Sequence, residues 1–320
     1  MAVATASGRG VKVAYISHAD CGRHDTGWRH PEHVGRLRAI PRALRDDIEL
    51  YHALEHVEGR VASEAELYLA HDADYVDEVR QLAKAGGGAL DADTVISDGS
   101  WDAARAAVGC VLDAVDMAVD GDARAFCAVR PPGHHALRNR AMGFCVFGNV
   151  AIGALYARQR RDVDRVLIVD WDVHHGNGTQ AMVEHDPAIR FISMHQSPWY
   201  PSTGAAGDRG PNRSIWNVPM PGGLPPDQYV TALQSAVADA TRDFTPDLVL
   251  VSAGFDCLAG DPLGEFTLEI EHMSQLTTWL LERATSWCDG RMLVALEGGY
   301  VPERVGAASV AVMRALLLQE

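Results

Sequence analysis

The stretch VLIVDWDVHHGNGT, residues 166–179, begins with five residues suited to a buried β-strand and continues into a polar, glycine-containing turn. In extended backbone, side chains two positions apart point to the same side, so Asp170, Asp172 and His174 share one side. This spacing predicts two carboxylates and an imidazole gathered where the strand ends. Such a set suits a divalent cation that keeps one coordination position open for water. The alternative is that Asp170 or Asp172 caps a helix that begins near Gly176.

Five more short runs rich in β-branched residues occur along the chain, with helical periodicity between them. One helical stretch, Trp101–Val119, places its apolar residues on one face and its aspartates off that face. Strands that alternate with helices form parallel sheets covered on both faces. We therefore expect an α/β fold with a single parallel sheet, in one domain over residues 1–320. The other predicted strands are Val11–Ile16, Phe126–Val129, Arg190–Met194, Asp247–Ser252 and Met292–Leu296.

Polar motifs follow five of these predicted strands at their carboxyl ends. In a parallel sheet those ends share one edge, where ligands bind. Five segments far apart in the sequence are therefore expected to form one pocket rich in His, Asp, Gly and Tyr. The motifs are RPPGHH (130–135), DWDVHHGNG (170–178), HQSPWYPSTG (195–204), AGFDCLAGDPLG (253–264) and EGGY (297–300).

The pocket motifs also supply candidates for acid–base chemistry. Asp256, which follows another strand, can add a further carboxylate to the Asp/His group. Two anionic ligands largely neutralise Zn²⁺, so such a site needs a separate base and a second electrophile for the developing oxyanion. The adjacent pair His134 and His135 can supply the acid–base groups, and ordinary packing is the alternative for them. Tyr300 could place its hydroxyl opposite the metal, or it could be a core tyrosine.

The composition excludes several classes of protein. With 28 Lys+Arg against 43 Asp+Glu the formal charge is −15, so we expect no nucleic-acid partner. A chain that is 47% hydrophobic and 22% charged is not disordered, and no stretch approaches the roughly 20 apolar residues of a membrane span. The six scattered cysteines form no CxxC pair, which favours a reducing cytoplasm over a disulfide scaffold or a thiolate zinc site.

Eight stretches, in order along nearly the whole chain, resemble motifs of the histone deacetylase / acetylpolyamine amidohydrolase family, which has the arginase–deacetylase fold. RPPGHHA and DVHHGNGT are similar to the class II branch, and the length resembles that of a bacterial-type member. The resemblance implies a zinc-dependent amidohydrolase that removes acetyl or related acyl groups from acyl-lysine or from a small acylated amine. The stretches are HPEHVGRLRAI, LDADTVISDGSW, RPPGHHA, MGFCVFGN, LIVDWDVHHGNGT, YPSTG, SAGFDCLAGDPLG and LEGGY.

The resemblance also implies roles for the catalytic residues. His135 would be the general base on the attacking water and later the acid for the leaving amine, with His134 as its electrostatic partner. Tyr300 would stabilise the tetrahedral oxyanion. Asn177 matches the position behind His135 that is Asp in class I members, so we expect a less basic histidine pair with coupled titrations. The zinc ligands implied in this way are Asp172, His174 and Asp256.

A structural potassium ion is implied as well. Asp170 would lie behind His134 and help to bind K⁺. The rest of the potassium shell would come from the His174 carbonyl, Ser193 and the Met194 carbonyl.

The same resemblance suggests which residues bind the substrate. Phe144 and Tyr200 match the aromatic walls of an acyl-lysine tunnel, and Gly143 leaves room for the chain. Asp93 matches a rim aspartate that binds substrate amides, or it is a plain loop residue. Leu263 stands where polyamine-selective relatives have an acidic residue, so its neutrality favours substrates other than long polyamines.

Other activities remain open on the sequence. An acetylpolyamine or another small amide could be the substrate. An arginase-like binuclear manganese enzyme would need extra Asp/His ligands, which His174-His175 and Asp256-Cys257 do not provide. A reader of acylated ligands that has lost catalysis would usually lack one of the site residues. Iron in place of zinc and a homo-oligomer are also compatible with the sequence.

Overall fold

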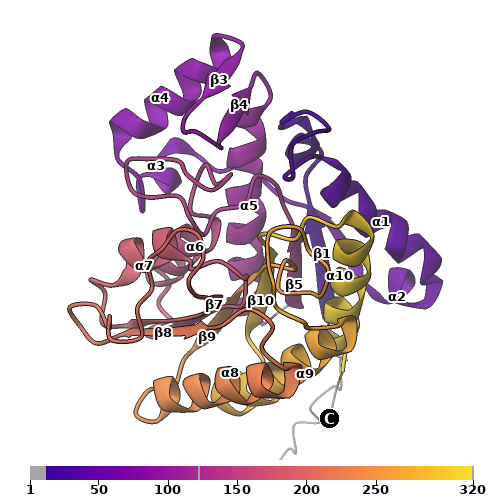
Figure 1. Cartoon of the computed structure of the whole chain (residues 1–320), viewed down its shortest axis with the longest axis vertical. Helices are drawn as coiled ribbons and strands as arrows, with labels where there is room; N and C mark the ends of the chain where they lie inside the picture. Colours follow the sequence, from indigo (N-terminus) through magenta and orange to yellow (C-terminus); the bar gives the residue numbers. More distant parts are fainter. Residues whose placement is uncertain (1–11, 122, 319–320) are drawn as a thin grey trace, which may run out of the picture.

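An eight-stranded parallel β-sheet runs through the middle of the molecule (Figure 1). The computed structural model describes residues 12–121 and 123–318. A small antiparallel pair, β3 (Gly87–Ala89) and β4 (Val95–Ser97), lies apart from the main sheet. In spatial order the eight strands are β2 (Glu55–Glu58), β1 (Lys12–Ser17), β5 (Ala123–Ala128), β10 (Met292–Leu296), β9 (Leu248–Ala253), β6 (Val166–Asp170), β7 (Ile189–Gln196) and β8 (Ile215–Met220).

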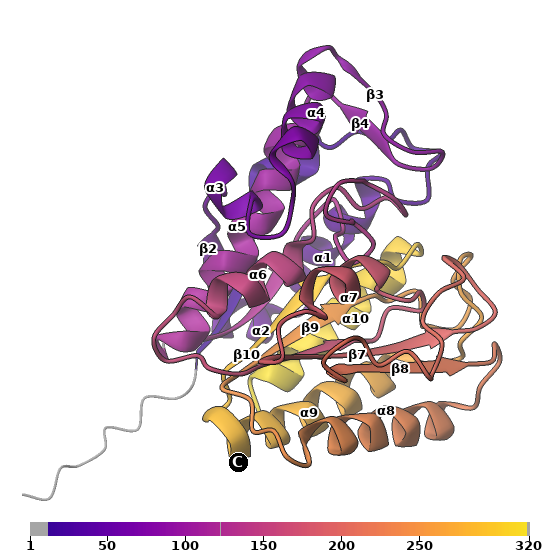
Figure 2. The ribbon, with the colours of Figure 1, turned by 90° about the vertical axis from the view of Figure 1, so that its left-hand side faces the viewer.

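Helices connect the strands and cover the sheet on both faces. Figure 2 shows α8 and α9 on one side of the sheet and α5, α6 and α7 on the other. The helices are α1 (Gly35–Asp46), α2 (Ile48–Ala53), α3 (Glu64–Leu67), α4 (Ala73–Lys84), α5 (Ser100–Val119), α6 (Asn149–Ala157), α7 (Asn177–Val183), α8 (Pro226–Thr241), α9 (Ile270–Cys288) and α10 (Pro302–Leu316), and a 3₁₀ turn η1 spans Ala19–Arg23.

Alternate side chains of each central strand enter different hydrophobic clusters. In β6, Leu167 and Val169 pack into the cluster that residues of α1, α8, α9 and α10 complete. Val166 and Ile168 belong to the cluster on the other face, with residues of α5 and α6. Burial on both faces explains why this strand is a continuous apolar run rather than an alternating one.

The expected α/β fold with a parallel main sheet is confirmed, and the differences lie at its margins. The predicted strands at 166–170 and 292–296 coincide with β6 and β10. Val11, where the first predicted strand begins, lies outside the described residues. The edge strands β2 and β8 and the small β3–β4 pair were not expected, because EHVE is polar and IWNVPM contains a proline. Edge strands have one unpaired flank, so they tolerate such residues.

The sheet brings the polar motifs together. Because the eight strands are parallel, their carboxyl ends lie on one edge. There β5, β6, β7, β9 and β10 end, and each is followed by one of the five motifs. Among the described residues, no helix combines the length and the apolar composition that a membrane span requires.

Candidate active site

Backbone amides hold the turn that follows β6. The Asp172 N–H donates to Asp170 Oδ1 at 3.1 Å, and the His174 N–H donates to Asp172 Oδ1 at 2.9 Å. Trp171 and Val173, between them, are fully buried in the hydrophobic core. The alternation expected from the sequence is therefore present, with three polar side chains on one side and two apolar ones on the other.

Asp172, His174 and Asp256 form a buried group whose potential ligand atoms all lie within 4.8 Å of one another. His174 Nδ1 lies 3.0 Å from Asp172 Oδ1 and 3.3 Å from Asp256 Oδ2. Asp256 follows β9, and its other oxygen accepts the Val173 N–H at 2.9 Å. Asp172 Oδ2 accepts the Gly298 N–H at 2.9 Å. A Cβ on Gly298 would lie 2.1 Å from Asp256 Oδ2, so this close approach requires glycine.

The group fits a divalent cation on its own chemistry. Asp256 Oδ2 is buried, and no hydrogen-bond partner for it exists among the described residues, because its contact with His174 lacks hydrogen-bond geometry. Burying an unpaired carboxylate oxygen costs free energy unless a cation binds to it. Burial opposes protonation of His174, yet the hydrogen bond to Asp172 and the charges of both carboxylates raise its pKa to about 10. The same charges would stabilise a metal ion at this nitrogen. Two carboxylates and one imidazole suit Zn²⁺ or Fe²⁺.

The two histidines of the RPPGHH turn lie beside this group, with ring centroids 4.0 Å apart. His134 Nδ1 bonds Asp170 Oδ2 at 3.0 Å, and its Nε2 lies 3.7 Å from Asp172 Oδ1. Burial opposes the charged form of His134, but Asp172 and Asp170 hold its pKa well above the usual value. The charges of these two carboxylates therefore favour the protonated form of His134.

His135 has the opposite environment. Its Nδ1 lies 2.7 Å from Asn177 Oδ1, which can only accept, so Nδ1 carries the proton and Nε2 keeps its lone pair. Burial, followed by the charges of His134 and His174, holds the pKa of His135 well below its usual value. The pKa values of the two histidines thus move in opposite directions, and the expectation of a less basic pair with coupled titrations stays a prediction.

Tyr300 reaches the site from the turn after β10. Its N–H donates to Asp261 Oδ2 at 2.7 Å, and its ring lies 5.8 Å from that of Phe144, nearly at right angles. Burial, and then the negative charge of Asp256, hold the pKa of the Tyr300 hydroxyl well above its usual value. The hydroxyl therefore stays a donor at any ordinary pH.

The two aromatic residues expected to line a tunnel, Phe144 and Tyr200, lie next to Tyr300 and His135 respectively. The Tyr200 ring is 5.2 Å from the His135 ring, at 89°, and Phe144 contacts Tyr300. Gly143, with φ +55°, lies between these groups: a Cβ there would meet His135 Cδ2 at 2.4 Å and Tyr200 Cε1 at 3.1 Å. The structure therefore places Gly143 and Tyr200 against His135, and Phe144 against Tyr300.

Asp93 bonds to Gly143, and Leu263 bonds to Trp199, the residue before Tyr200. Asp93 Oδ1 accepts the Gly143 N–H at 3.2 Å, so this carboxylate supports the loop that carries Gly143. The Leu263 carbonyl accepts the indole N–H of Trp199 at 2.8 Å, next to Tyr200. The roles of Asp93 and Leu263 in substrate binding stay predictions.

The residues expected to bind potassium lie together beneath the site. Asp170 and Ser193 are partners in the register of β6 and β7, and Met194 follows in β7, fully buried. Ser193 Oγ accepts the Gly176 N–H at 3.3 Å. Both oxygens of Asp170 already accept hydrogen bonds, from the Asp172 N–H and from His134. A potassium ion here remains a prediction.

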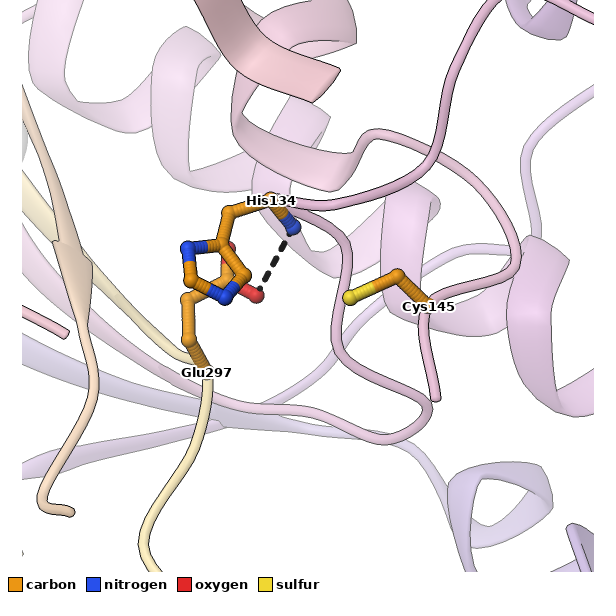
Figure 3. A group of neighbouring side chains, drawn as sticks. All are labelled: His134, Cys145 and Glu297. Carbon is orange, nitrogen blue, oxygen red and sulfur yellow. Dashed lines mark hydrogen bonds between the residues drawn. The ribbon is translucent and has the colours of Figure 1, made fainter. Parts of the chain in front are cut away.

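A second buried group, His134, Cys145 and Glu297, also has ligand atoms within 4.8 Å of one another (Figure 3). Glu297 Oε2 accepts the backbone N–H groups of Gly133 at 2.7 Å and His134 at 3.1 Å. Burial, and then the charge of Glu297, hold the pKa of the Cys145 thiol well above its usual value, so the thiolate a metal needs is disfavoured. We interpret Glu297 as the support of the histidine turn.

Several of these supporting residues were not singled out from the sequence. Glu297, Glu32, Arg36 and Arg130 are all completely or almost completely buried at the site. All four lie inside quoted motifs, but a charged residue in a polar loop ordinarily faces solvent. Their burial depends on pairing between segments that the sequence alone does not reveal.

His175 does not supply a ligand for a second metal. Its Nδ1 bonds Thr203 Oγ1 at 2.8 Å and its Nε2 bonds Gln180 Oε1 at 2.9 Å. The ring packs 4.7 Å from that of His195, beneath the loop that carries Tyr200. This arrangement agrees with the sequence argument against a binuclear site.

Comparison with known proteins shows the family. A model described as the histone deacetylase domain matches residues 30–316. A histone deacetylase-like amidohydrolase of Pseudomonas aeruginosa is 39% identical over 261 residues, covering 80% of this chain and 68% of that protein. Human histone deacetylase 9 is 36% identical over 337 residues, covering 94% of this chain, which spans only 32% of the human protein.

The fold comparison agrees. The crystal structure of the HD domain of HDA15 matches with a TM-score of 0.91 and 36% sequence identity, covering 97% of this chain and 89% of that one. Hydrolase activity of the deacetylase and amidohydrolase type is the chemistry that the family match supports. The family match spans most of the chain, and its relatives match in sequence and in fold: this chain belongs to the histone deacetylase family.

Proposed function

We propose that the chain is a zinc-dependent amidohydrolase of one catalytic domain, residues 1–320, that removes acetyl or related acyl groups from an acylated amine. One observation carries the proposal: a buried group of two carboxylates and one histidine, which could hold a metal ion, lies beside His135, and the turn after β10 brings Tyr300 to the same edge of the sheet. Asp172, His174 and Asp256 would hold the zinc ion. When bound, Zn²⁺ supplies a Lewis acid that polarises the scissile carbonyl.

His135 is the proposed general base. Its Nδ1–H is held by Asn177, so Nε2 is free to take the proton of the attacking water. The same nitrogen then returns that proton to the amine as it leaves. Asp172 and Asp170 favour a protonated His134, whose charge would stabilise the negative charge that develops on the substrate.

Tyr300 is the proposed oxyanion donor. Its raised pKa keeps the hydroxyl proton available for the substrate oxygen while that oxygen gains charge. The Asp261 carboxylate holds the Tyr300 backbone, which limits how far the hydroxyl can drift.

The proposed substrate is an acyl group on a methylene chain, as in acyl-lysine, or a small acylated amine. Phe144 and Tyr200 offer flat walls to such a chain, and Gly143 leaves space between them. Asp93 would bind substrate amides at the rim, and Leu263 offers no charge to a distant ammonium. A potassium ion held by Asp170, Ser193 and the Met194 carbonyl would stiffen the strand ends below.

The expectations about partners and location fit this proposal. All six cysteines are free and buried, which supports a reducing cytoplasm as the location. The charge of −15 gives no reason to expect nucleic acid as a partner. A homo-oligomer stays a prediction for sedimentation to test.

The experiment is turnover of a matched panel by the zinc-loaded protein, with a chelated control. The panel holds an acetyl-lysine peptide, its trifluoroacetyl and longer-acyl analogues, and acetylated putrescine and spermidine. Chelator-sensitive hydrolysis is the expected result, with the acetyl-lysine peptides ahead of the polyamines. A reversed ranking would assign the chain to the polyamine alternative. Binding of these ligands without turnover, with zinc present, would instead indicate a reader of acylated ligands.

A further inference from the structure

Glu32 is a completely buried carboxylate clamped between two completely buried arginines. Arg130 meets it with a two-pronged contact, Nε to Oε1 at 2.6 Å and Nη2 to Oε2 at 2.8 Å. Arg36 donates from Nη1 to Oε1 at 2.8 Å. Forked contacts of this kind fix direction as well as distance. The mechanism proposed above uses none of these three side chains.

Arg36 connects this carboxylate to the turn that carries Tyr300. Its Nε donates to the Gly299 carbonyl at 2.5 Å, and its Nη2 donates to the Glu297 carbonyl. The guanidinium also lies 5.1 Å from the centre of the Tyr300 ring. The position of the Tyr300 turn therefore depends on where Glu32 holds Arg36.

Arg130 connects the same carboxylate to the turn that carries the histidine pair. It is the first residue of RPPGHH, four positions before His134. Its Nη1 donates to the His24 carbonyl at 2.9 Å, and its Nη2 also donates to the Glu32 carbonyl at 3.0 Å. The start of the histidine turn is thereby fixed against the segment that contains Glu32.

The two turns meet directly as well. The Glu297 side chain accepts the N–H groups of Gly133 and His134, and Figure 3 shows its contact with His134. Glu32, Arg36, Glu297 and Arg130 thus close a ring of contacts around the two turns. Glu32 is the one carboxylate in this ring that touches both arginines.

Charge makes Glu32 hard to replace. Burial disfavours its ionised form, but Arg130 and Arg36 lower its pKa to about 2. His24 lies 3.6 Å away, and burial lowers its pKa to about 4, so it adds no charge near neutral pH. Without Glu32, two guanidinium groups would share a dry site with only carbonyl oxygens as acceptors, and they would repel each other.

We propose that Glu32 is a positioning residue: through Arg36 and Arg130 it fixes the turn of the oxyanion donor Tyr300 relative to the turn of the base His135. The inference rests on the proposed function for its catalytic part, because the two turns carry the groups assigned there. Its structural part, the fixing of two turns by one carboxylate, stands independently of the substrate.

The test compares Glu32→Gln, which keeps the reach and removes the charge, with Glu32→Asp, which keeps the charge and shortens the reach. Asp113→Asn is the matched control. Asp113 lies on α5, away from both turns, and its Oδ1 is 3.0 Å from Arg60 Nε, so this variant also removes one carboxylate from an ion pair with arginine. The measurements are the melting temperature, bound zinc, kcat and KM on an acetyl-lysine peptide, and amide hydrogen exchange of segments 130–136 and 296–301.

We expect folded Glu32→Gln to lose about 100-fold in kcat, with KM within about threefold of wild type, as misplacement of catalytic groups does. Exchange in both segments should be about tenfold faster while bound zinc is unchanged, and Glu32→Asp should fall between Glu32→Gln and wild type. Asp113→Asn should show neither change. If Glu32→Gln does not fold, Glu32→Asp carries the same test.

Unchanged exchange in both segments, or a wild-type kcat in either folded Glu32 variant, would overturn the proposal. A wild-type enzyme inactive on every acylated amine would refute the proposed function instead. In that case the hydrogen exchange alone still decides whether Glu32 fixes the two turns.

Discussion

Replacing Asn177 by aspartate would place a carboxylate where an amide oxygen now accepts the Nδ1–H of His135 at 2.7 Å. The negative charge would lie about 4 Å from the centre of the imidazolium, and Coulomb's law at an effective dielectric constant of 20 gives about 4 kcal/mol. That energy corresponds to about three pKa units. Because it is an upper value, we expect the pKa of His135 to rise by about one to three units.

The sign of the effect on catalysis follows from the role of His135. The base must be neutral at Nε2, and burial together with His134 and His174 now holds its pKa well below the usual value. Raising this pKa leaves the histidine protonated over a wider acidic range. The acidic limb of the kcat/KM profile should therefore move to higher pH by about one to three pH units.

The assay is kcat/KM on an acetyl-lysine peptide from pH 4 to 10 for wild type, Asn177→Asp and a control. Asn139→Asp is the control, because it adds the same charge at an exposed loop position. Its acidic limb should stay within a few tenths of a unit of wild type. An acidic limb in Asn177→Asp that stays in place or moves to lower pH would refute His135 as the base.

Three further predictions concern Tyr300, Gly143 and His71. Tyr300→Phe should lower kcat by about 10²–10³-fold with one zinc per chain retained, and normal turnover would remove Tyr300 from the oxyanion site. Gly143→Ala would place a Cβ 2.4 Å from His135 Cδ2 at φ +55° and should cost about 1–3 kcal/mol and most of the activity. Gly86→Ala, at φ +98° with nothing within 4 Å, should cost only about 1 kcal/mol and leave activity unchanged; equal effects would refute the steric argument. Burial lowers the pKa of His71 from 6.5 to about 4, so the unfolded chain takes up a proton first as the pH falls. About 3 kcal/mol of stability should be lost between pH 6.5 and 4, and urea unfolding should show a smaller loss in His71→Gln.

The central strands were predictable because they are buried on both faces. VLIVD and MLVAL read as continuous apolar runs, and they coincide with β6 and β10. The edge strand β2, EHVE, has only one neighbour and mostly exposed side chains, so no hydrophobic pattern marks it. Pairing with β1, rather than its own composition, makes this segment a strand.

The metal group was predictable for a different reason. The two-residue spacing of Asp170, Asp172 and His174 fixes the direction of the side chains within one extended segment. Glu32 and Arg130 lie 98 positions apart, and their contact depends on how two loops fold onto each other. Local pattern carries no information about such a pair, which is why the residues that support the site emerged only from the structure.

The most direct test is a titration of metal-free protein with Zn²⁺ in which bound zinc and turnover of an acetyl-lysine peptide are followed together. The three-residue group predicts that both rise in parallel and saturate at one zinc per chain. Asp256→Asn, which removes one of the three ligands, should bind zinc weakly and show little turnover. Full turnover in the chelated protein, or a requirement for a second equivalent of metal, would contradict a single-zinc deacylase site.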